Sequence, residues 1–141
     1  MIVVVDASCL VSAALKENSI PEQAMLRAIG EGNRLILSQE VEDEYREVLG
    51  RPKFDRFVSL QRRQRILGLV LVAAERVEPT ELVRECADPK DDKYLSLAAA
   101  GAADVIVTGD EKHLLPMTPW RGIPILRAAA FLEYRGTGTQ A

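Results

Sequence analysis

The sequence predicts an α/β fold in which helices cover a mainly parallel central sheet. Two observations carry this prediction. Short β-branched runs alternate with longer segments of helical periodicity, which is the pattern of parallel strands joined by helices. The connections are short, with no internal repeat, low-complexity segment or interdomain linker. The length of 141 residues agrees with one domain, since domains cluster at about 100–150 residues.

The strands are expected where apolar, mostly β-branched residues form short runs. The runs Ile2–Val5 and Val105–Val107 are apolar throughout and predict buried strands. Three weaker runs predict further strands at Arg34–Leu37, 76–78 and 123–126.

The helices are expected where apolar residues recur at helical spacing between a capping residue and a stop. Ser38 predicts the N-cap of a helix that ends near Leu49, before Gly50. Asp88 and Pro89 predict the N-cap and the first residue of a helix that ends near position 100. Further helices are expected at 8–16, 21–29, 52–57, 61–74 and 128–134.

The composition excludes several classes of protein. Hydrophobic residues make up 48% of the chain and charged residues 28%, which excludes disorder over the whole length. No apolar run approaches the ~20 residues of a membrane span, and no basic segment precedes Ile2–Val5 as in a secretory signal. Cys9 and Cys86 are too few for a disulfide framework. We therefore expect a cytoplasmic protein that does not associate with membranes.

Four acids from four separate segments are candidates for one site. Asp6 directly follows the first strand, and Asp110 lies just after the strand Val105–Val107. Glu44 borders the apolar face of its helix, whereas the neighbouring acids at 42, 43 and 47 are expected to face solvent. Asp92 lies in the first turn of its helix. Ligand sites of open α/β sheets lie at the carboxyl ends of the strands, so we expect these acids to converge.

Converging carboxylates predict a metal site. Burying isolated carboxylates is unfavourable unless a cation compensates them. Mg²⁺ and Mn²⁺ prefer oxygen ligands, and they can activate a water and neutralise charge on a phosphodiester. The acids therefore favour metal-assisted hydrolysis of phosphodiester bonds.

Each candidate also has a plainer interpretation. Asp6 can cap the following helix, Glu44 can be a surface acid, and Asp110 can be a turn residue. Asp88 is expected to cap a helix, while Asp91 fits either stabilisation of a helix N-terminus or a metal role. For two further residues the structural interpretation is favoured: His113, as a structural or surface residue, and Cys9, as a small core residue.

The charge of the chain is uneven. The net charge of −3 disfavours nucleic acid as a partner, because such proteins usually carry a basic surface. Residues 46–65, however, carry a local charge of +5. This segment can hold phosphates near the metal, or it can be a solvated helix face with ordinary ion pairs. The residues we expect to contact RNA are Arg46, Arg51, Lys53 and Arg56.

Five motifs in order resemble one family over residues 2–130. They are Val4-Val5-Asp6-Ala7-Ser8, the run Ser38 to Leu49, Arg51-Pro52-Lys53-Phe54, the run Asp88 to Ala98, and the run Ala103 to Asp110. The chain resembles the PIN-domain family, and within it the small VapC-like ribonuclease toxins of prokaryotic toxin–antitoxin pairs. The resemblance implies a three-layer, Rossmann-like α/β/α fold. We expect this domain to span residues 1–134, and the polar residues at 135–141 predict a flexible tail.

The resemblance also implies roles and partners. The chain is expected to be a Mg²⁺- or Mn²⁺-dependent endoribonuclease, to form a homodimer and to be inhibited by a small antitoxin protein across the acidic groove. The four family acids fall on Asp6, Glu44, Asp92 and Asp110, with Asp91 able to share the third role. The supporting hydroxyl groups fall on Ser8 and Thr108.

Two rival functions remain open. A non-catalytic PIN module would bind RNA or protein without cleaving it. A phospho-accepting receiver or phosphatase domain would use Asp6 as the nucleophile. The second rival leaves Glu44 without a role and lacks the expected late lysine, since no lysine follows Lys112.

Overall fold

A five-stranded, all-parallel sheet forms the centre of the protein, which we describe from a computed structural model that covers residues 1–136. The strand order is β3-β2-β1-β4-β5. The strands are β1 (Ile2–Val5), β2 (Arg34–Leu37), β3 (Glu75–Arg76), β4 (Val105–Val107) and β5 (Ile125–Leu126). Val3 pairs with Leu35 on one side and with Val105 on the other. The predicted parallel sheet is therefore confirmed.

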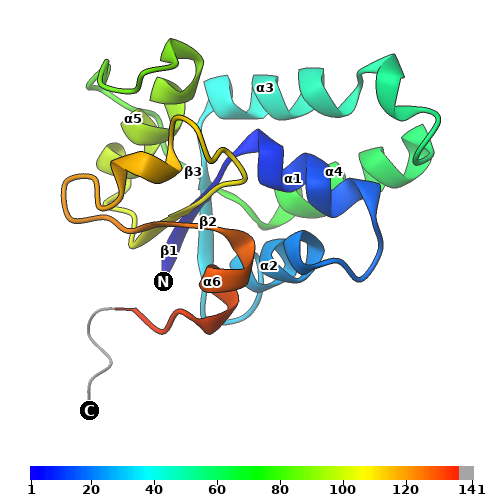
Figure 1. Cartoon of the computed structure of the whole chain (residues 1–141), viewed down its shortest axis with the longest axis horizontal. Helices are drawn as coiled ribbons and strands as arrows, with labels where there is room; N and C mark the ends of the chain where they lie inside the picture. The colour runs from blue at the N-terminus through cyan, green and yellow to red at the C-terminus, as the bar shows by residue number, and fades with distance from the viewer. Residues whose placement is uncertain (137–141) are drawn as a thin grey trace.

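Helices cover both faces of this sheet. The α-helices are α1 (Ala7–Leu15), α2 (Ile20–Ala28), α3 (Gln39–Leu49), α4 (Leu60–Ala73), α5 (Asp92–Ala100) and α6 (Ala128–Glu133). Short 3₁₀ turns are η1 (Pro52–Phe54), η2 (Pro89–Asp91) and η3 (Leu115–Met117). Figure 1 shows α5 on one side of the strands and α1, α2 and α4 on the other. This arrangement confirms the predicted three-layer α/β/α fold.

The expected helix at Asp88 differs from the structure in its first turn. Asp88 caps the 3₁₀ turn η2 by accepting a hydrogen bond from the Lys90 N–H at 3.0 Å. The α-helical pattern begins only at Asp92. A short 3₁₀ turn at a helix start changes the direction of successive side chains, which matters for the site described below.

The topology creates a switch point between β1 and β4. These strands are neighbours in the sheet, but the chain leaves β1 toward α1 on one face and reaches β4 from α5 on the other (Figure 1). Ligand sites of such sheets lie in the crevice at the carboxyl ends of the two strands. The fold therefore brings the residues after Val5 and Val107 together.

Two further expectations concern the whole chain. None of the helices within residues 1–136 is long and apolar enough to cross a membrane. Of the tail expected at 135–141, residues 137–141 lie outside the described part of the chain.

Candidate functional site

A cavity of about 450 Å³ lies at the switch point of the sheet. Its lining comes from the ends of β1 and β4, from α3 and from the segment that leads into α5. The acidic residues that line it are Asp6, Glu44, Asp88, Asp91 and Asp110. The basic residues that line it are Arg51, Lys90 and His113. The predicted convergence of Asp6, Glu44 and Asp110 is therefore present in the structure.

Asp6 lies at the base of the cavity and is 2% exposed. Its carboxylate accepts hydrogen bonds from the Cys9 N–H at 2.9 Å, from the Ser8 hydroxyl at 2.8 Å and from the Thr108 hydroxyl. Burial raises the pKa of Asp6, while these hydrogen bonds, with that of Thr108 the largest, oppose the increase. Asp6 thus caps α1 and also presents a carboxylate to the cavity.

Ser8 and Thr108 link the ends of β1 and β4. The Ser8 hydroxyl accepts a hydrogen bond from the Gly109 N–H at 3.0 Å. The Thr108 hydroxyl accepts one from the Asp110 N–H at 2.8 Å. A Cβ at Gly109 would lie 3.0 Å from the Ser8 hydroxyl, so the close approach favours glycine. The arrangement supports the expected role of both hydroxyl groups in orienting the acids.

Glu44 is held by two consecutive residues of α5. The Lys93 ammonium lies 2.9 Å from Oε2, and the Tyr94 hydroxyl donates to Oε1. Burial, with the charges of Tyr45 and Glu44, keeps the pKa of Tyr94 well above its ordinary value, so the hydroxyl retains its proton. The Tyr94 oxygen also accepts the Ala7 N–H at 3.0 Å. Glu44 is therefore fixed in position relative to the end of β1.

Asp91 and Asp110 interact directly in the cavity. Burial, followed by the hydrogen bond and the charge of Asp110, raises the pKa of Asp91 to about 8. Burial acts in the same direction on Asp110, but hydrogen bonds from Asp91 and from the N–H groups of His113 and Lys112 outweigh it and lower the pKa of Asp110. In the absence of a cation, one proton is therefore held by Asp91 beside an ionised Asp110.

Asp92 does not line this cavity, which corrects its expected position. Its Oδ1 accepts hydrogen bonds from the N–H groups of Glu85 at 3.1 Å and Cys86 at 2.8 Å. The side chain instead borders a separate cavity of about 530 Å³. The reason is the 3₁₀ turn η2, which directs Asp91 toward the acids and Asp92 toward the preceding loop. Asp91 thus lines the cavity together with Asp6, Glu44 and Asp110.

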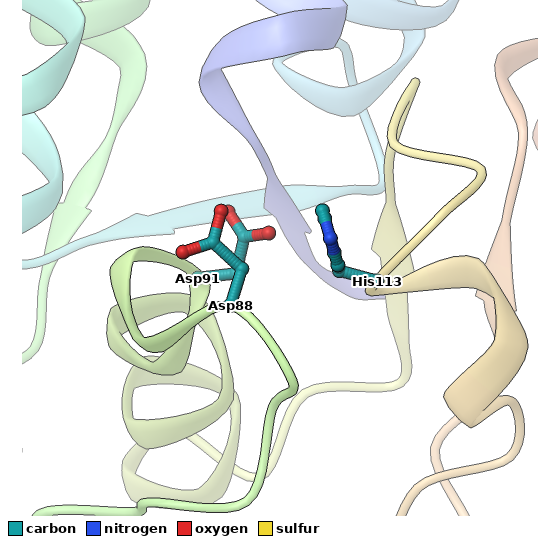
Figure 2. Close-up of side chains that lie close together, drawn as sticks. All are labelled: Asp88, Asp91 and His113. Carbon is teal, nitrogen blue, oxygen red and sulfur yellow. The ribbon is translucent and has the colours of Figure 1, made fainter.

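His113 and Asp88 belong to the site although they were not expected there. Ligand atoms of Asp88, Asp91 and His113 all lie within 4.8 Å of one another. Figure 2 shows the two carboxylates close together on the segment before α5, and the imidazole on the segment after β4. The His113 Nδ1 also lies 3.3 Å from the Asp110 Oδ2. The sequence could have indicated this position of His113, because residues three apart in a turn often have side chains that lie close together, and His113 lies three residues after Asp110.

Cys9 is inert in this setting. It is buried and carries a free thiol, and burial together with the charge of Asp6 raises its pKa to about 12. A thiol that stays protonated is a poor nucleophile. The favoured interpretation of Cys9 as a core residue agrees with these surroundings.

The expected basic segment separates into residues with different surroundings. Arg51 lines the cavity and pairs with Glu47 at 2.8 Å. Lys53 and Arg56 are exposed. Arg46 does not line the cavity, because it pairs with Glu42 at 2.8 Å. The structure thus brings Arg51 to the acids and directs Arg46 away from them.

Glu42 corrects a further expectation, since it is 6% exposed and not a solvated acid. Its carboxylate pairs with Arg46 of α3 and with Arg76 of β3. Two arginine partners compensate the charge that burial would otherwise destabilise. Glu42 therefore joins α3 to the edge of the sheet.

The acids of the cavity fit a hard divalent cation. Carboxylate oxygens and an imidazole nitrogen are ligands that Mg²⁺ and Mn²⁺ accept. Burial is the main cause of the raised pKa of Asp91, and the charges of Asp110, Asp88 and Asp6 act in the same direction. A bound cation would remove this repulsion.

Similar proteins are found by sequence and by structure. The sequence model of the PIN domain matches residues 2–112. PAE2754 from Pyrobaculum aerophilum is 22% identical, with a TM-score of 0.65 over 93% of this chain and 86% of that chain. VapBC2 from Rickettsia felis, bound to a DNA fragment from their promoter, is 14% identical, with a TM-score of 0.59 over 90% of this chain and 98% of that chain. No curated protein matches significantly. At these identities the two structures show the fold.

Proposed function

The chain belongs to the PIN domain family, and from this premise we propose that it is a Mg²⁺- or Mn²⁺-dependent endoribonuclease. The observation that carries the proposal is the convergence of Asp6, Glu44, Asp91 and Asp110 on one cavity. The arrangement also supports a chemical class, because a cluster of oxygen ligands suits metal-assisted hydrolysis of a phosphodiester.

The roles of the residues follow from their surroundings. Asp6, Asp91 and Asp110 would hold the cation, and Glu44 would complete the acidic site from α3. When bound, the cation would activate a water for attack on the phosphodiester and neutralise developing charge. Ser8 and Thr108 hold Asp6 in place, and Thr108 also accepts the Asp110 N–H. Asp92 is assigned to the loop that precedes α5 and not to the reaction.

The RNA would approach the cavity from its basic side. Arg51 lines the cavity, and Lys53 and Arg56 follow it at the surface. Positively charged side chains that contact phosphates position a nucleic acid without reading its sequence. We assign these three residues to the RNA-binding surface. We leave Arg46 out because it does not line the cavity and pairs with the buried Glu42, whereas Arg51 lines the cavity although it pairs with Glu47.

We further propose a physiological role as the toxin of a toxin–antitoxin pair, in a cytoplasmic setting. VapBC2, similar in fold, supports this role. Exposed apolar side chains on α2 and α4 support a protein partner, among them Leu26 at 52% and Leu69 at 53% exposure. The partner would be a small antitoxin protein. A homodimer is proposed on the family resemblance alone.

Cleavage of RNA by the full chain tests the proposed activity. With Mg²⁺ or Mn²⁺ the wild-type protein is expected to cleave RNA, and EDTA should abolish cleavage. Asp6→Asn should reduce the rate by 100-fold or more, an order of magnitude that corresponds to roughly 3 kcal/mol of lost transition-state stabilisation.

The alternative is a PIN module that binds RNA or protein without cleaving it. It predicts RNA binding with no metal-dependent products in the wild type. Equal degradation of RNA by the wild type and by Asp6→Asn would indicate a contaminating nuclease and remove the assigned site.

A further inference from the structure

Glu44 differs from the other acids of the cavity because both of its carboxylate oxygens are engaged by α5. Lys93 lies 2.9 Å from Oε2, and the Tyr94 hydroxyl donates to Oε1. The Lys93 side chain is only 11% exposed and Glu44 is 23% exposed. This ion pair is thus largely shielded from water. Charge-assisted hydrogen bonds are stronger in such partly buried surroundings than at the protein surface.

The Lys93 ammonium is held in this position from more than one side. It donates to the Lys90 carbonyl as well as to Glu44, and it lies 5.7 Å from the centre of the Tyr94 ring. A lysine with several partners loses the mobility that makes most surface lysine pairs weak. Lys93 therefore provides a fixed positive charge beside Glu44.

The other acids of the cavity have no such cation. Within residues 1–136, no lysine or arginine forms an ion pair with Asp6, Asp88, Asp91 or Asp110. Among these four acids, Asp110 has the His113 imidazole at 3.3 Å. The cavity is thus divided into a half at Glu44 whose charge is compensated by the protein and a half at Asp91 and Asp110 whose charge is not.

We propose that Lys93 is a positioning residue that takes the place of a second divalent cation at Glu44, so that the site binds one cation and not two. The proposal rests on the proposed metal-dependent function. The single cation belongs to the uncompensated half with Asp6, Asp91 and Asp110. Lys93 holds the Glu44 carboxylate in place, and its charge repels a second cation from that carboxylate.

The number of bound cations tests this inference without reference to activity. Mn²⁺ alone is titrated into the full chain without RNA, and free Mn²⁺ is measured by electron paramagnetic resonance. The wild type is expected to bind one Mn²⁺ per chain. Lys93→Met removes the ammonium but retains the length of the side chain, so this variant should bind two.

Three variants serve as controls. Lys90→Met removes a positive charge from the same cavity but leaves the pair of Lys93 and Glu44 intact, so it should still bind one Mn²⁺. Lys93→Arg retains the charge and should also bind one. In the double variant Lys93→Met/Glu44→Gln, loss of the carboxylate should return the count from two to one.

Several outcomes would overturn the inference. They are two Mn²⁺, or none, in the wild type, and one Mn²⁺ in a folded Lys93→Met variant. If Lys93→Met does not fold, Lys93→Gln replaces it, and the count in the wild type still decides. A wild type that binds one Mn²⁺ but leaves RNA intact would contradict the proposed function alone, whereas one that binds two and cleaves RNA would contradict this inference alone.

Discussion

Asp91 and Asp92 are adjacent in the sequence but have different surroundings in the structure. Spacing alone favours Asp92, because it lies three residues before Leu95, on the expected inward face of the helix. Leu95 is indeed fully buried, yet the Asp92 carboxylate is engaged by the N–H groups of Glu85 and Cys86. These partners lie in a loop whose path cannot be read from helical periodicity, which is why the sequence favoured Asp92 over Asp91.

At the same scale, Asp91 predicts how pH affects the metal-free protein. Burial and Asp110 raise the pKa of Asp91 to about 8, so the folded protein binds this proton more tightly than the unfolded chain does. The contribution to stability is complete below about pH 4 and is lost as the pH rises through about 8. Asp91→Asn should therefore raise the melting temperature at pH 8.5, by roughly 2–4 °C if about 1 kcal/mol remains after solvent screening.

Thermal unfolding in EDTA at pH 4 and pH 8.5 measures this difference. At pH 4 the wild type and Asp91→Asn should unfold at similar temperatures, because Asp91 binds its proton in both the folded and the unfolded chain. Addition of Mg²⁺ at pH 8.5 should stabilise the wild type and have little effect on the variant. A melting temperature of Asp91→Asn below that of the wild type at pH 8.5 would show that the acids do not repel one another.

At the scale of elements, α3 was predicted closely in its bounds and less closely in its faces. Ser38 caps the helix through the Val41 N–H, and Val41 and Tyr45 are buried as their spacing predicts. Glu42 is buried as well, because Arg76 of β3 reaches it from the edge of the sheet. Because Arg76 belongs to another element, its contact with Glu42 cannot be predicted from the apolar periodicity of α3.

The segment after α3 depends on one arginine of α4. Arg63 is 1% exposed and donates hydrogen bonds to the carbonyl groups of Leu49 at 2.8 Å and Arg51 at 3.2 Å. It also pairs with Asp55. Arg63→Met would remove this donor from the Leu49 carbonyl, whereas the Arg51 carbonyl would still accept the Phe54 N–H at 3.1 Å. We expect a loss of about 2–3 kcal/mol in the free energy of unfolding, together with weaker RNA binding because Arg51 would no longer be held at the cavity.

Urea denaturation followed by circular dichroism measures the change in stability. Arg65→Met is the matched control, since Arg65 lies two residues along the same helix and is exposed. It should change the free energy of unfolding by less than about 0.5 kcal/mol. Equal effects of the two substitutions would mean that Arg63 does not anchor the segment.

At the scale of the whole molecule, the net charge of −3 does not show how the acidic and basic residues are distributed around the cavity. The basic segment at 46–65 is only partly available to RNA, because Arg62 pairs with Glu22 at 2.8 Å and Arg63 is buried. The cavity is instead lined by Lys90, from the segment before α5, while Lys93 of α5 pairs with Glu44, one of its lining acids. The local charge of residues 46–65 therefore indicated a basic surface, but it did not identify the basic residues that the segment near α5 contributes.

The layers of the fold could be predicted because each strand and helix has its own local signature. The motif resemblance supplied the Rossmann-like arrangement. The order of the strands is a property of the whole chain, and it is this order that places Asp6 and Asp110 beside one another at the switch point. Three acids of the site, Asp6, Glu44 and Asp110, were predictable because each follows a strand or borders an apolar helix face. Lys93, His113 and Asp88 were not, since their roles depend on contacts across the cavity.

We propose that the acids around Asp91 form the catalytic site of a metal-dependent ribonuclease. The most direct measurement compares RNA cleavage in Mg²⁺ by Asp91→Asn and by Asp92→Asn. The two substitutions remove the same charge from adjacent residues, and the asparagine oxygen at 92 can still accept the N–H groups of Glu85 and Cys86. We predict that Asp91→Asn loses cleavage by 100-fold or more, an effect of roughly 3 kcal/mol, while Asp92→Asn stays within a few-fold of the wild type. Loss of cleavage in Asp92→Asn with activity retained in Asp91→Asn would contradict the account.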